Sequence, residues 1–322
     1  MSRDKQCDQH GLRPFALQWR SRAWHGATEE YSVADSAKSQ IPRRAYRDDV
    51  KLSIIGLGGI AVVGLSDLDC RRLVERSLER GVNYFDLAPT YGNGEAEEKL
   101  GAALQGRRDE VFLACKTTER SADGARRELE QSLRRARTDH FDLYQFHGVL
   151  TLEQVEQIMA PGGAGEVLLE ARRQGKARYL GLTAHSEEAA IAVMDRFPCD
   201  SVAFPINFVC YARSGFGARV VEHARRKGVA CLAIKAMAQT RWPEGAEKKY
   251  PKCWYQPIED PELARRALRF TLSEGVTTTI PPADRGLFEM ALDLAADLEP
   301  MGDRERHELL ALAQGIEPIF PW

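Results

Sequence analysis

The chain of 322 residues is predicted to be an α/β protein, a TIM-type (β/α)8 barrel of eight parallel strands with an N-terminal extension and a C-terminal helix. From about residue 50, short apolar runs rich in β-branched and aromatic residues alternate with amphipathic stretches at helical spacing. Eight such units within roughly 250 residues favour a closed barrel. An open doubly wound sheet usually has fewer strands and a GxGxxG fingerprint, whose spacing the run "GLGGIAVVG" at 56–64 lacks.

The eight apolar runs are the expected strands, and each is followed by a polar or Gly-containing loop. They cover residues 52–59, 82–88, 111–117, 141–147, 178–185, 201–207, 229–237 and 276–282. Helices are expected between them at 67–81, 125–137 and 217–228, where apolar residues recur three and four positions apart. Two of these helical stretches close with Gly, which is a common helix terminator.

The chain divides into an expected N-terminal extension at 1–45 and a barrel domain at 46–322. The extension is polar, with several Arg and Ser residues and little periodicity. The segments "IPRRAY" at 41–46 and "VKLSIIG" at 50–56 predict a short hairpin that closes the bottom of the barrel.

Composition points to a small-molecule partner. The formal charge is -2, from 45 basic and 47 acidic residues, so no strong field favours nucleic acid or an anionic membrane. The seven cysteines contain no CxxC pattern and no His pair at zinc spacing, which argues against a disulfide framework or a metal site. There is no apolar stretch of about 18 residues. A reduced, cytoplasmic location is expected, and the oligomeric state stays open.

Four polar residues lie at or just after the ends of three consecutive predicted strands. Asp86 and Tyr91 follow the second strand, Lys116 ends the third, and His147 ends the fourth. In a barrel the carboxyl ends of the strands face a common mouth, so these side chains are expected to meet although some 60 residues separate them. Each alone has an ordinary structural explanation as a turn former, a solvated strand end or a satisfied histidine.

The segments "NYFDLAPTYGNGEAEEKLG", "VFLACKT" and "DLYQFHG" resemble the signature segments of the aldo-keto reductase family. The similarity extends over about residues 46 to 315 and includes "GKARYLGLTAHS" and "TTTIPP". The resemblance implies a nicotinamide cofactor bound without a Rossmann domain. It also implies a catalytic tetrad of Asp86, Tyr91, Lys116 and His147.

Carbonyl reduction explains these residue types. Hydride addition leaves negative charge on the carbonyl oxygen, and a positioned acid, here Tyr91, must deliver a proton to it. A phenol with a pKa near 10 is a reluctant donor at neutral pH. We expect Lys116 to lower that pKa, Asp86 to keep the lysine charged, and His147 to orient and polarise the carbonyl oxygen.

The expected cofactor is NADP, from the family resemblance, or NAD. Its contacts are expected around the ends of the last four strands, at Thr183, His185, Asn207, Lys235, Pro281, Pro282, Asp284 and Arg285. Lys235 could meet a pyrophosphate, and Arg285 is the only candidate cation for an extra ribose phosphate, next to the anion Asp284. This chain departs from the family pattern where Ala184, Ala203 and Ile234 replace residues that usually hold the nicotinamide.

The long segment 239–261 is rich in Pro and aromatic residues, and loops of this length after a barrel strand commonly shape a pocket. Trp242, Trp254 and Tyr255 are therefore candidate substrate contacts. The predicted function is NAD(P)(H)-dependent reduction of an aldehyde, ketone or sugar carbonyl, or oxidation of the alcohol. The alternatives are a nucleotide-sensing relative with slow turnover and, less favoured, a metal-dependent hydrolase.

Overall fold

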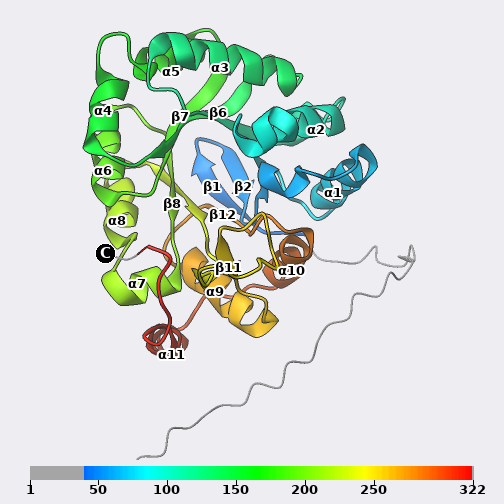
Figure 1. Ribbon diagram of the computed structural model, residues 1–322, viewed down its shortest axis with the longest axis vertical. Coiled ribbons are helices and arrows are strands. Elements are labelled where there is room, and N and C mark those ends of the chain that lie inside the picture. The colour runs from blue at the N-terminus through cyan, green and yellow to red at the C-terminus, as the bar shows by residue number, and fades with distance from the viewer. Residues whose placement is uncertain (1–39, 321–322) are drawn as a thin grey trace, which may run out of the picture. The chain divides into compact units, whose positions relative to one another are not determined.

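The computed structural model describes residues 40–320. Eight parallel strands form one sheet in the order β12-β9-β8-β7-β6-β5-β4-β3, and parallel pairing of Ile55 with Thr279 joins its two ends (Figure 1). The expected eight-stranded barrel is therefore confirmed. The strands are β3 (Leu57–Gly58), β4 (Tyr84–Asp86), β5 (Phe112–Thr117), β6 (Phe141–Val149), β7 (Ala177–Ala184), β8 (Ser201–Pro205), β9 (Ala230–Ile234) and β12 (Thr278–Ile280).

Helices surround the barrel strands in Figure 1. The α-helices within the described residues are α1 (Asp67–Glu79), α2 (Glu95–Ala103), α3 (Ala122–Arg135), α4 (Leu152–Met159), α5 (Ala164–Arg173), α6 (Glu187–Arg196), α7 (Phe208–Ser214), α8 (Ala218–Lys227), α9 (Pro261–Ser273), α10 (Arg285–Ala295) and α11 (Asp303–Ala313). Short 3-10 turns lie at η1 (Gly59–Val62), η2 (Tyr91–Gly94) and η3 (Arg108–Glu110).

The three helices expected from periodicity are confirmed as α1, α3 and α8, and α11 is the expected C-terminal helix. The second of the three begins at Ala122, three residues before the predicted start. Its first turn is fixed by Ser121, whose side chain accepts a hydrogen bond from the Gly124 amide. An N-cap of this kind provides an acceptor for one of the first-turn amides that have no partner within the helix.

The predicted hairpin is present as β1 (Arg43–Arg47) and β2 (Val50–Ser53), which pair antiparallel. Strand β1 begins two residues before the expected domain boundary at 45/46, so the described hairpin includes the last residues assigned to the extension. The Tyr46 ring packs edge-on against Phe112 and Tyr179 at centroid distances of 5.1 Å and 5.3 Å. These contacts close the end of the barrel where β5 and β7 begin.

The inward and outward residues of the strands pack against different partners. Outward residues pack against the helices, whereas the inward Tyr84, Ala114, Leu143 and Leu232 form a separate apolar cluster inside the barrel. Above this cluster, toward the carboxyl ends of the strands, the buried residues become polar, with Asp86 4% exposed and Lys116 2% exposed. The fold therefore places the buried Asp86 and Lys116 at the mouth.

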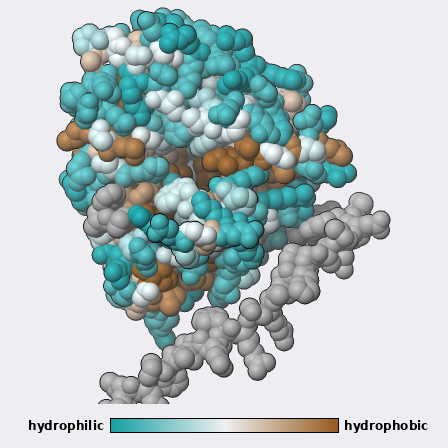
Figure 2. Space-filling model, viewed as in Figure 1, coloured by the Kyte–Doolittle hydropathy of each residue, from teal (hydrophilic) through white to brown (hydrophobic). Residues whose placement is uncertain are grey.

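A second hairpin follows β9 and covers part of the mouth. It consists of β10 (Ala238–Arg241) and β11 (Tyr255–Pro257), with the segment 242–254 between them. Figure 2 shows hydrophilic residues over most of this face and hydrophobic residues gathered in a band across its middle. None of the helices within residues 40–320 is long and apolar enough to cross a membrane.

Candidate active site

Lys116 is the centre of the polar cluster at the mouth. Its Nζ donates to Asp86 Oδ2 at 2.6 Å, to the Leu87 carbonyl at 2.7 Å and to the Tyr91 hydroxyl at 3.2 Å. Asp86 ends β4 and Lys116 lies near the end of β5, on adjacent parallel strands. All three ammonium protons thus have acceptors, which fixes the position of the charge beside the phenol.

Tyr91 reaches this lysine because the chain turns sharply between β4 and α2. Gly92 and Asn93, which follow Tyr91, have φ values of 63° and 54°, and Gly94 has φ of 98°. Gly adopts this left-handed backbone freely and Asn tolerates it, whereas most other residues are strained there. The "YGNG" sequence therefore encodes the turn that holds Tyr91 over the barrel mouth.

His147 completes the group from β6. Its ring lies edge-on to the Tyr91 ring, with centroids 5.9 Å apart and planes at 87°. Arg120 donates to the His147 carbonyl at 2.7 Å and holds this part of the strand in place. The Nδ1 atom of His147 is buried and has no hydrogen-bond partner within the described part of the chain. The structure therefore brings all four predicted tetrad residues together.

Burial and neighbouring charges together shift the pKa values of Tyr91 and Lys116. Burial raises the pKa of the Tyr91 phenol, and the neighbouring Lys116 charge lowers it by a smaller amount. The expected effect of Lys116 on the phenol is therefore confirmed in direction, but the pKa of Tyr91 is raised on balance, because removing a phenolate from water costs more free energy than the neighbouring ammonium restores. Burial opposes the charge on Lys116, but the Asp86 carboxylate and Tyr91 outweigh it and raise the lysine pKa.

His147 is neutral over the physiological pH range. Burial, followed by the Lys116 charge, lowers its pKa to about 3. A neutral imidazole carries one N–H donor and one acceptor, so it can hydrogen-bond a carbonyl oxygen without bringing a second cation to the phenol. Within the tetrad the formal charges are thus one carboxylate and one ammonium.

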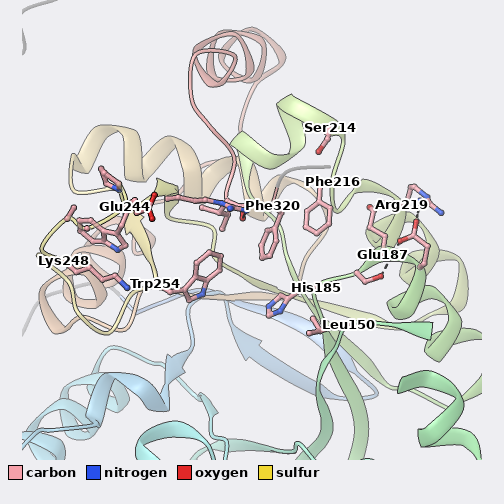
Figure 3. Close-up of a pocket in the computed structure, with 18 residues that line it drawn as sticks. Leu150, His185, Glu187, Ser214, Phe216, Arg219, Glu244, Lys248, Trp254 and Phe320 are labelled. Atoms are coloured by element: carbon pink, nitrogen blue, oxygen red, sulfur yellow. Dashed lines mark hydrogen bonds and ion pairs between the residues drawn. The ribbon is translucent and has the colours of Figure 1, made fainter. Parts of the chain in front are cut away.

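Two cavities lie at the barrel mouth, and one of them is lined by tetrad residues. The tetrad cavity is lined by Asp86 and Tyr91 together with Lys235 and Pro281, and it has a volume of about 140 Å³. The outer cavity, of about 1100 Å³, lies between α6, the segment 241–248 and the C-terminal residues (Figure 3). Trp254 lines both cavities.

The expected cofactor residues differ in how their side chains are hydrogen-bonded. Thr183 is buried, and its Oγ1 accepts a hydrogen bond from the Gly148 amide at 2.7 Å, which leaves the hydroxyl proton free to donate. Asn207 caps α7: its Oδ1 accepts from the Val209 and Cys210 amides. Its Nδ2 donates to the carbonyls of Lys235 and Ala238. Every hydrogen-bonding atom of the Asn207 amide therefore serves the backbone.

Lys235 and His185 form a pair that sequence reasoning did not anticipate. Lys235 Nζ lies 3.1 Å from His185 Nε2, and it lies within 6 Å of the ring centroids of Trp254 and Phe320. Lys235 also has φ of 63°, a strained value for a residue with a side chain. Burial lowers the pKa of Lys235 to about 8. Burial and the lysine charge lower the pKa of His185 to about 3.

The loop after β12 contributes the remaining expected residues. Pro281 and Pro282 line the tetrad cavity. Asp284 caps α10 by accepting from the Leu287 amide at 3.1 Å. The half-exposed Arg285 donates from Nε to Glu289 at 3.1 Å, so its guanidinium is only partly engaged.

The predicted substrate residues lie around the cavities. Trp242 lines the outer cavity and donates from Nε1 to the Cys253 carbonyl at 2.8 Å. Tyr255 lines the tetrad cavity, and Trp254 is 47% exposed. Phe320, which was not predicted, stacks on His185 with centroids 5.5 Å apart. No motif near residue 320 signals this contact, because it depends on the C-terminal segment folding back over the mouth.

Fold and site together define an α/β-barrel protein with a buried polar cluster at the carboxyl ends of its strands. Residues 54–285 match the Aldo/keto reductase family, and the chain belongs to this family. Its members are typically NAD(P)H-dependent carbonyl oxidoreductases. Within the described residues, no group of three or more His, Cys, Asp or Glu side chains could hold a metal ion.

Similar proteins include curated relatives as well as solved structures. The aldo-keto reductase YhdN of Bacillus subtilis (strain 168) is 33% identical over 175 residues, which are 49% of this chain and 51% of that protein. L-galactose dehydrogenase of Arabidopsis thaliana is 25% identical over 205 residues, or 59% of this chain and 63% of that protein. The match spans about half the length of the first of these relatives.

Solved structures show the same fold. The holo form of aldo-keto reductase AKR11C1 from Bacillus halodurans has a TM-score of 0.68 at 23% identity, covering 87% of this chain and 99% of that one. An aldo/keto reductase from Klebsiella pneumoniae in complex with NADP and acetate has a TM-score of 0.61 at 19% identity, covering 88% and 97%. At these identities the likeness is one of fold.

Proposed function

We propose that this protein is an NAD(P)(H)-dependent oxidoreductase that reduces an aldehyde, ketone or sugar carbonyl, or oxidises the alcohol, with Tyr91 as the general acid or base. The observation that carries the proposal is the position of the Lys116 ammonium, which donates to both Asp86 and Tyr91. A phenol beside a fixed, charged ammonium is equipped to exchange a proton with an alkoxide. The family to which the chain belongs supports the same chemistry.

Each tetrad residue has a distinct part in the proposed reaction. Tyr91 donates its proton to the carbonyl oxygen, and Lys116 stabilises the phenolate that remains. Asp86 keeps the ammonium charged and directed, because its Oδ2 lies 2.6 Å from Nζ. The neutral His147 hydrogen-bonds the carbonyl oxygen and orients it toward the phenol. In the reverse direction, Tyr91 is the base that takes the alcohol proton.

The residues around Tyr91 fit a nicotinamide ring. The tetrad cavity has apolar walls from Ile234, Ile280 and Pro281, which suit the faces of a flat ring. A side chain at Gly58 would narrow this space, since its Cβ would approach Ile280 Cγ2 to 2.8 Å. The bound cofactor would supply or accept the hydride. Family members in complex with NADP are known among the structural neighbours, and either NADP or NAD is proposed for this chain.

We assign the cofactor contacts mainly to the β7 and β12 ends of the barrel. The Thr183 hydroxyl can donate to the carboxamide, and Pro281 and Pro282 can pack on the ring. Arg285, at the start of α10, is the candidate for an extra ribose phosphate. Asn207 acts indirectly, because it fixes the loop that follows β9. Trp242, Trp254 and Tyr255 remain proposed substrate contacts.

The cytoplasm is the proposed location. The six described cysteines are all buried and unpaired, a state that a reducing compartment maintains. Small-molecule carbonyl compounds or alcohols are the proposed partners.

A direct test is a screen of the purified protein for NADPH and NADH oxidation with aldehydes, ketones and keto sugars. Tyr91→Phe should lower kcat by about 10²- to 10⁴-fold, because the phenyl ring keeps the shape but has no proton to give. Cofactor affinity, measured by fluorescence titration, should change little. Turnover of Tyr91→Phe close to wild type would contradict the assignment. A single burst of one cofactor equivalent without steady-state turnover would favour a slow nucleotide sensor instead.

A further inference from the structure

The Lys235 ammonium stands out among the described charges of the mouth because it has no carboxylate beside it. Its hydrogen-bond partner is the neutral His185 at 3.1 Å, and burial lowers the pKa of the lysine. By contrast, Lys116 is paired with Asp86 at 2.6 Å. Lys235 is partly exposed, and a partly desolvated cation without an anion is costly, so this ammonium is suited to receive a negatively charged group from a ligand.

The surroundings of Lys235 point toward the outer cavity. Its neighbours His185, Trp254 and Phe320 all line that cavity, and Figure 3 shows these three side chains pointing into one common space. Lys235 itself lines the tetrad cavity with Tyr91. The ammonium therefore lies between the tetrad cavity, which Lys235 lines, and the three side chains that line the outer cavity. Pro281 and Pro282, which we assign to the cofactor, line only the tetrad cavity.

The other charges of the outer cavity balance one another. Arg219 pairs with Glu187 at 3.5 Å and Glu188 at 2.9 Å on α6. The remaining lining charges are Arg241, Lys248 and Glu244, so three cations stand against three carboxylates. Lys235 is the additional positive charge at this junction. Aromatic rings beside it, from Trp254 and Phe320, offer a surface for an apolar or aromatic body.

From this geometry we infer that the substrate is a carbonyl compound that bears a carboxylate on an apolar or aromatic body, and that Lys235 binds the carboxylate while His185 positions the ammonium. His185 Nε2 accepts from the lysine and thus fixes where the charge lies. The inference rests on the proposed reductase function and names its substrate class. The alternative role of Lys235, binding the cofactor pyrophosphate, is an outcome of the test below.

The test compares two aldehydes of nearly equal size, 4-carboxybenzaldehyde and its neutral methyl ester, methyl 4-formylbenzoate. The readout is the ratio of their kcat/KM values, in which a general loss of activity cancels. Wild type should prefer the carboxylate. Lys235→Met should lower the ratio about 10- to 100-fold, the range typical of a lost charge-assisted hydrogen bond. Lys235→Arg, which keeps the charge, should retain most of the preference.

Lys252→Met is the matched control. Lys252 lines the same tetrad cavity, but its Nζ donates to the Ala61 carbonyl at 3.1 Å. Its removal should leave the ratio within about threefold, because a charge that is not in contact with the ligand is largely screened. Equal losses in both Met variants would mean a general field effect and would overturn the inference.

Two further measurements separate the possible failures. Titration of NADPH and NADH into Lys235→Met should give affinities close to wild type. Weakened cofactor binding with an unchanged aldehyde ratio would assign the ammonium to the cofactor phosphates and overturn the inference. Calorimetry of 4-carboxybenzaldehyde with wild type and Lys235→Met reports carboxylate binding even without turnover. If wild type reduces the methyl ester but shows no carboxylate preference and no Lys235-dependent binding, the reductase proposal stands and this inference fails.

Discussion

At the scale of single residues, the site depends on how burial and charge act together on Tyr91. Burial holds the phenol in its protonated form, and Lys116 partly offsets this by favouring the phenolate. A proton donor must be protonated before the reaction and able to carry negative charge after it. Because Lys116 Nζ lies 3.2 Å from the phenol oxygen, one ammonium can serve the second requirement without abolishing the first.

Lys116→Met should reduce the rate and move the alkaline limb of the pH profile to higher pH. Carbonyl reduction needs protonated Tyr91 and is lost as pH rises through the phenol pKa. Removing the ammonium removes the interaction that lowers this pKa, so the limb moves upward. The measurement is kcat/KM for reduction against pH in both proteins. An unchanged limb would show that Lys116 does not tune Tyr91.

The same substitution leaves the Asp86 carboxylate buried without its cation, which typically costs about 3 to 5 kcal/mol of folding free energy. The double variant Asp86→Asn with Lys116→Met is the control, because it removes the stranded charge. Its unfolding midpoint should lie above that of Lys116→Met alone. Its alkaline limb should also be displaced upward from wild type.

At the scale of elements, the loops after the strands decide which side chains reach the mouth. Asn207 ends the loop after β8, caps α7, and through Nδ2 ties down the Lys235 and Ala238 carbonyls that follow β9. One side chain therefore joins two consecutive strand–loop units. Lys235 has a backbone conformation with φ of 63°, and the bond to its carbonyl helps hold that strained position.

Asn207→Ala should destabilise the protein by about 2 to 4 kcal/mol. The estimate combines the loss of a helix cap, about 1 kcal/mol, with buried carbonyls left without donors. Urea unfolding followed by circular dichroism measures the effect. Ser121→Ala, which removes only the N-cap of α3, is the control and should cost about 1 kcal/mol. Equal losses in the two variants would show that the bonds to the β9 loop contribute nothing.

Cofactor choice is a property of the loop that enters α10. Asp284 caps this helix and Arg285 is partly held by Glu289, so the preference for NADP over NAD should be modest or should lean to NAD. If NADP is used, Arg285→Ala should weaken it about 10- to 100-fold and spare NAD. Arg304→Ala on α11 removes a similar i,i+4 pair and should change neither affinity. A strong NADP preference that survives Arg285→Ala would place the phosphate site elsewhere.

At the scale of the whole molecule, the barrel mouth holds two neutral histidines. Burial lowers the folded-state pKa of His147 and of His185 to about 3, whereas an unfolded histidine titrates near 6.5. Below pH 6.5 the unfolded chain therefore binds protons that the folded chain does not. The contribution of these two histidines to stability is fully present above about pH 6.5, and it is lost progressively as the pH falls toward 3.

Lowering the pH from 7 to 5 should reduce the free energy of unfolding by on the order of 1 to 2 kcal/mol for each of these two histidines. Urea unfolding at both pH values, in wild type and in His147→Gln with His185→Gln, measures this. The double variant should lose less stability on acidification than wild type. His307→Gln, on the exposed face of α11, is the control and should lose as much as wild type. An equal pH dependence in the double variant would contradict the burial argument.

The sequence by itself determined the barrel and its eight strands, and it predicted that Asp86, Lys116 and His147 lie at the ends of consecutive strands. Strand and helix periodicities are local, and parallel pairing brings the ends of consecutive strands together whatever the loops do. The catalytic roles of Asp86, Lys116 and His147 were predicted from the resemblance to the family, and the "YGNG" turn encodes the place of Tyr91.

Only the tertiary structure decided what depends on burial or on distant segments. It showed that the Tyr91 pKa is raised on balance, because desolvation is set by all the neighbours that exclude water rather than by one adjacent charge. It showed that the Asn207 amide hydrogen-bonds the backbone of α7 and of the loop after β9. It also joined Lys235 to His185, 50 residues earlier, and brought Phe320 onto the same histidine. Such contacts follow from loop closure, on which local residue patterns carry no information.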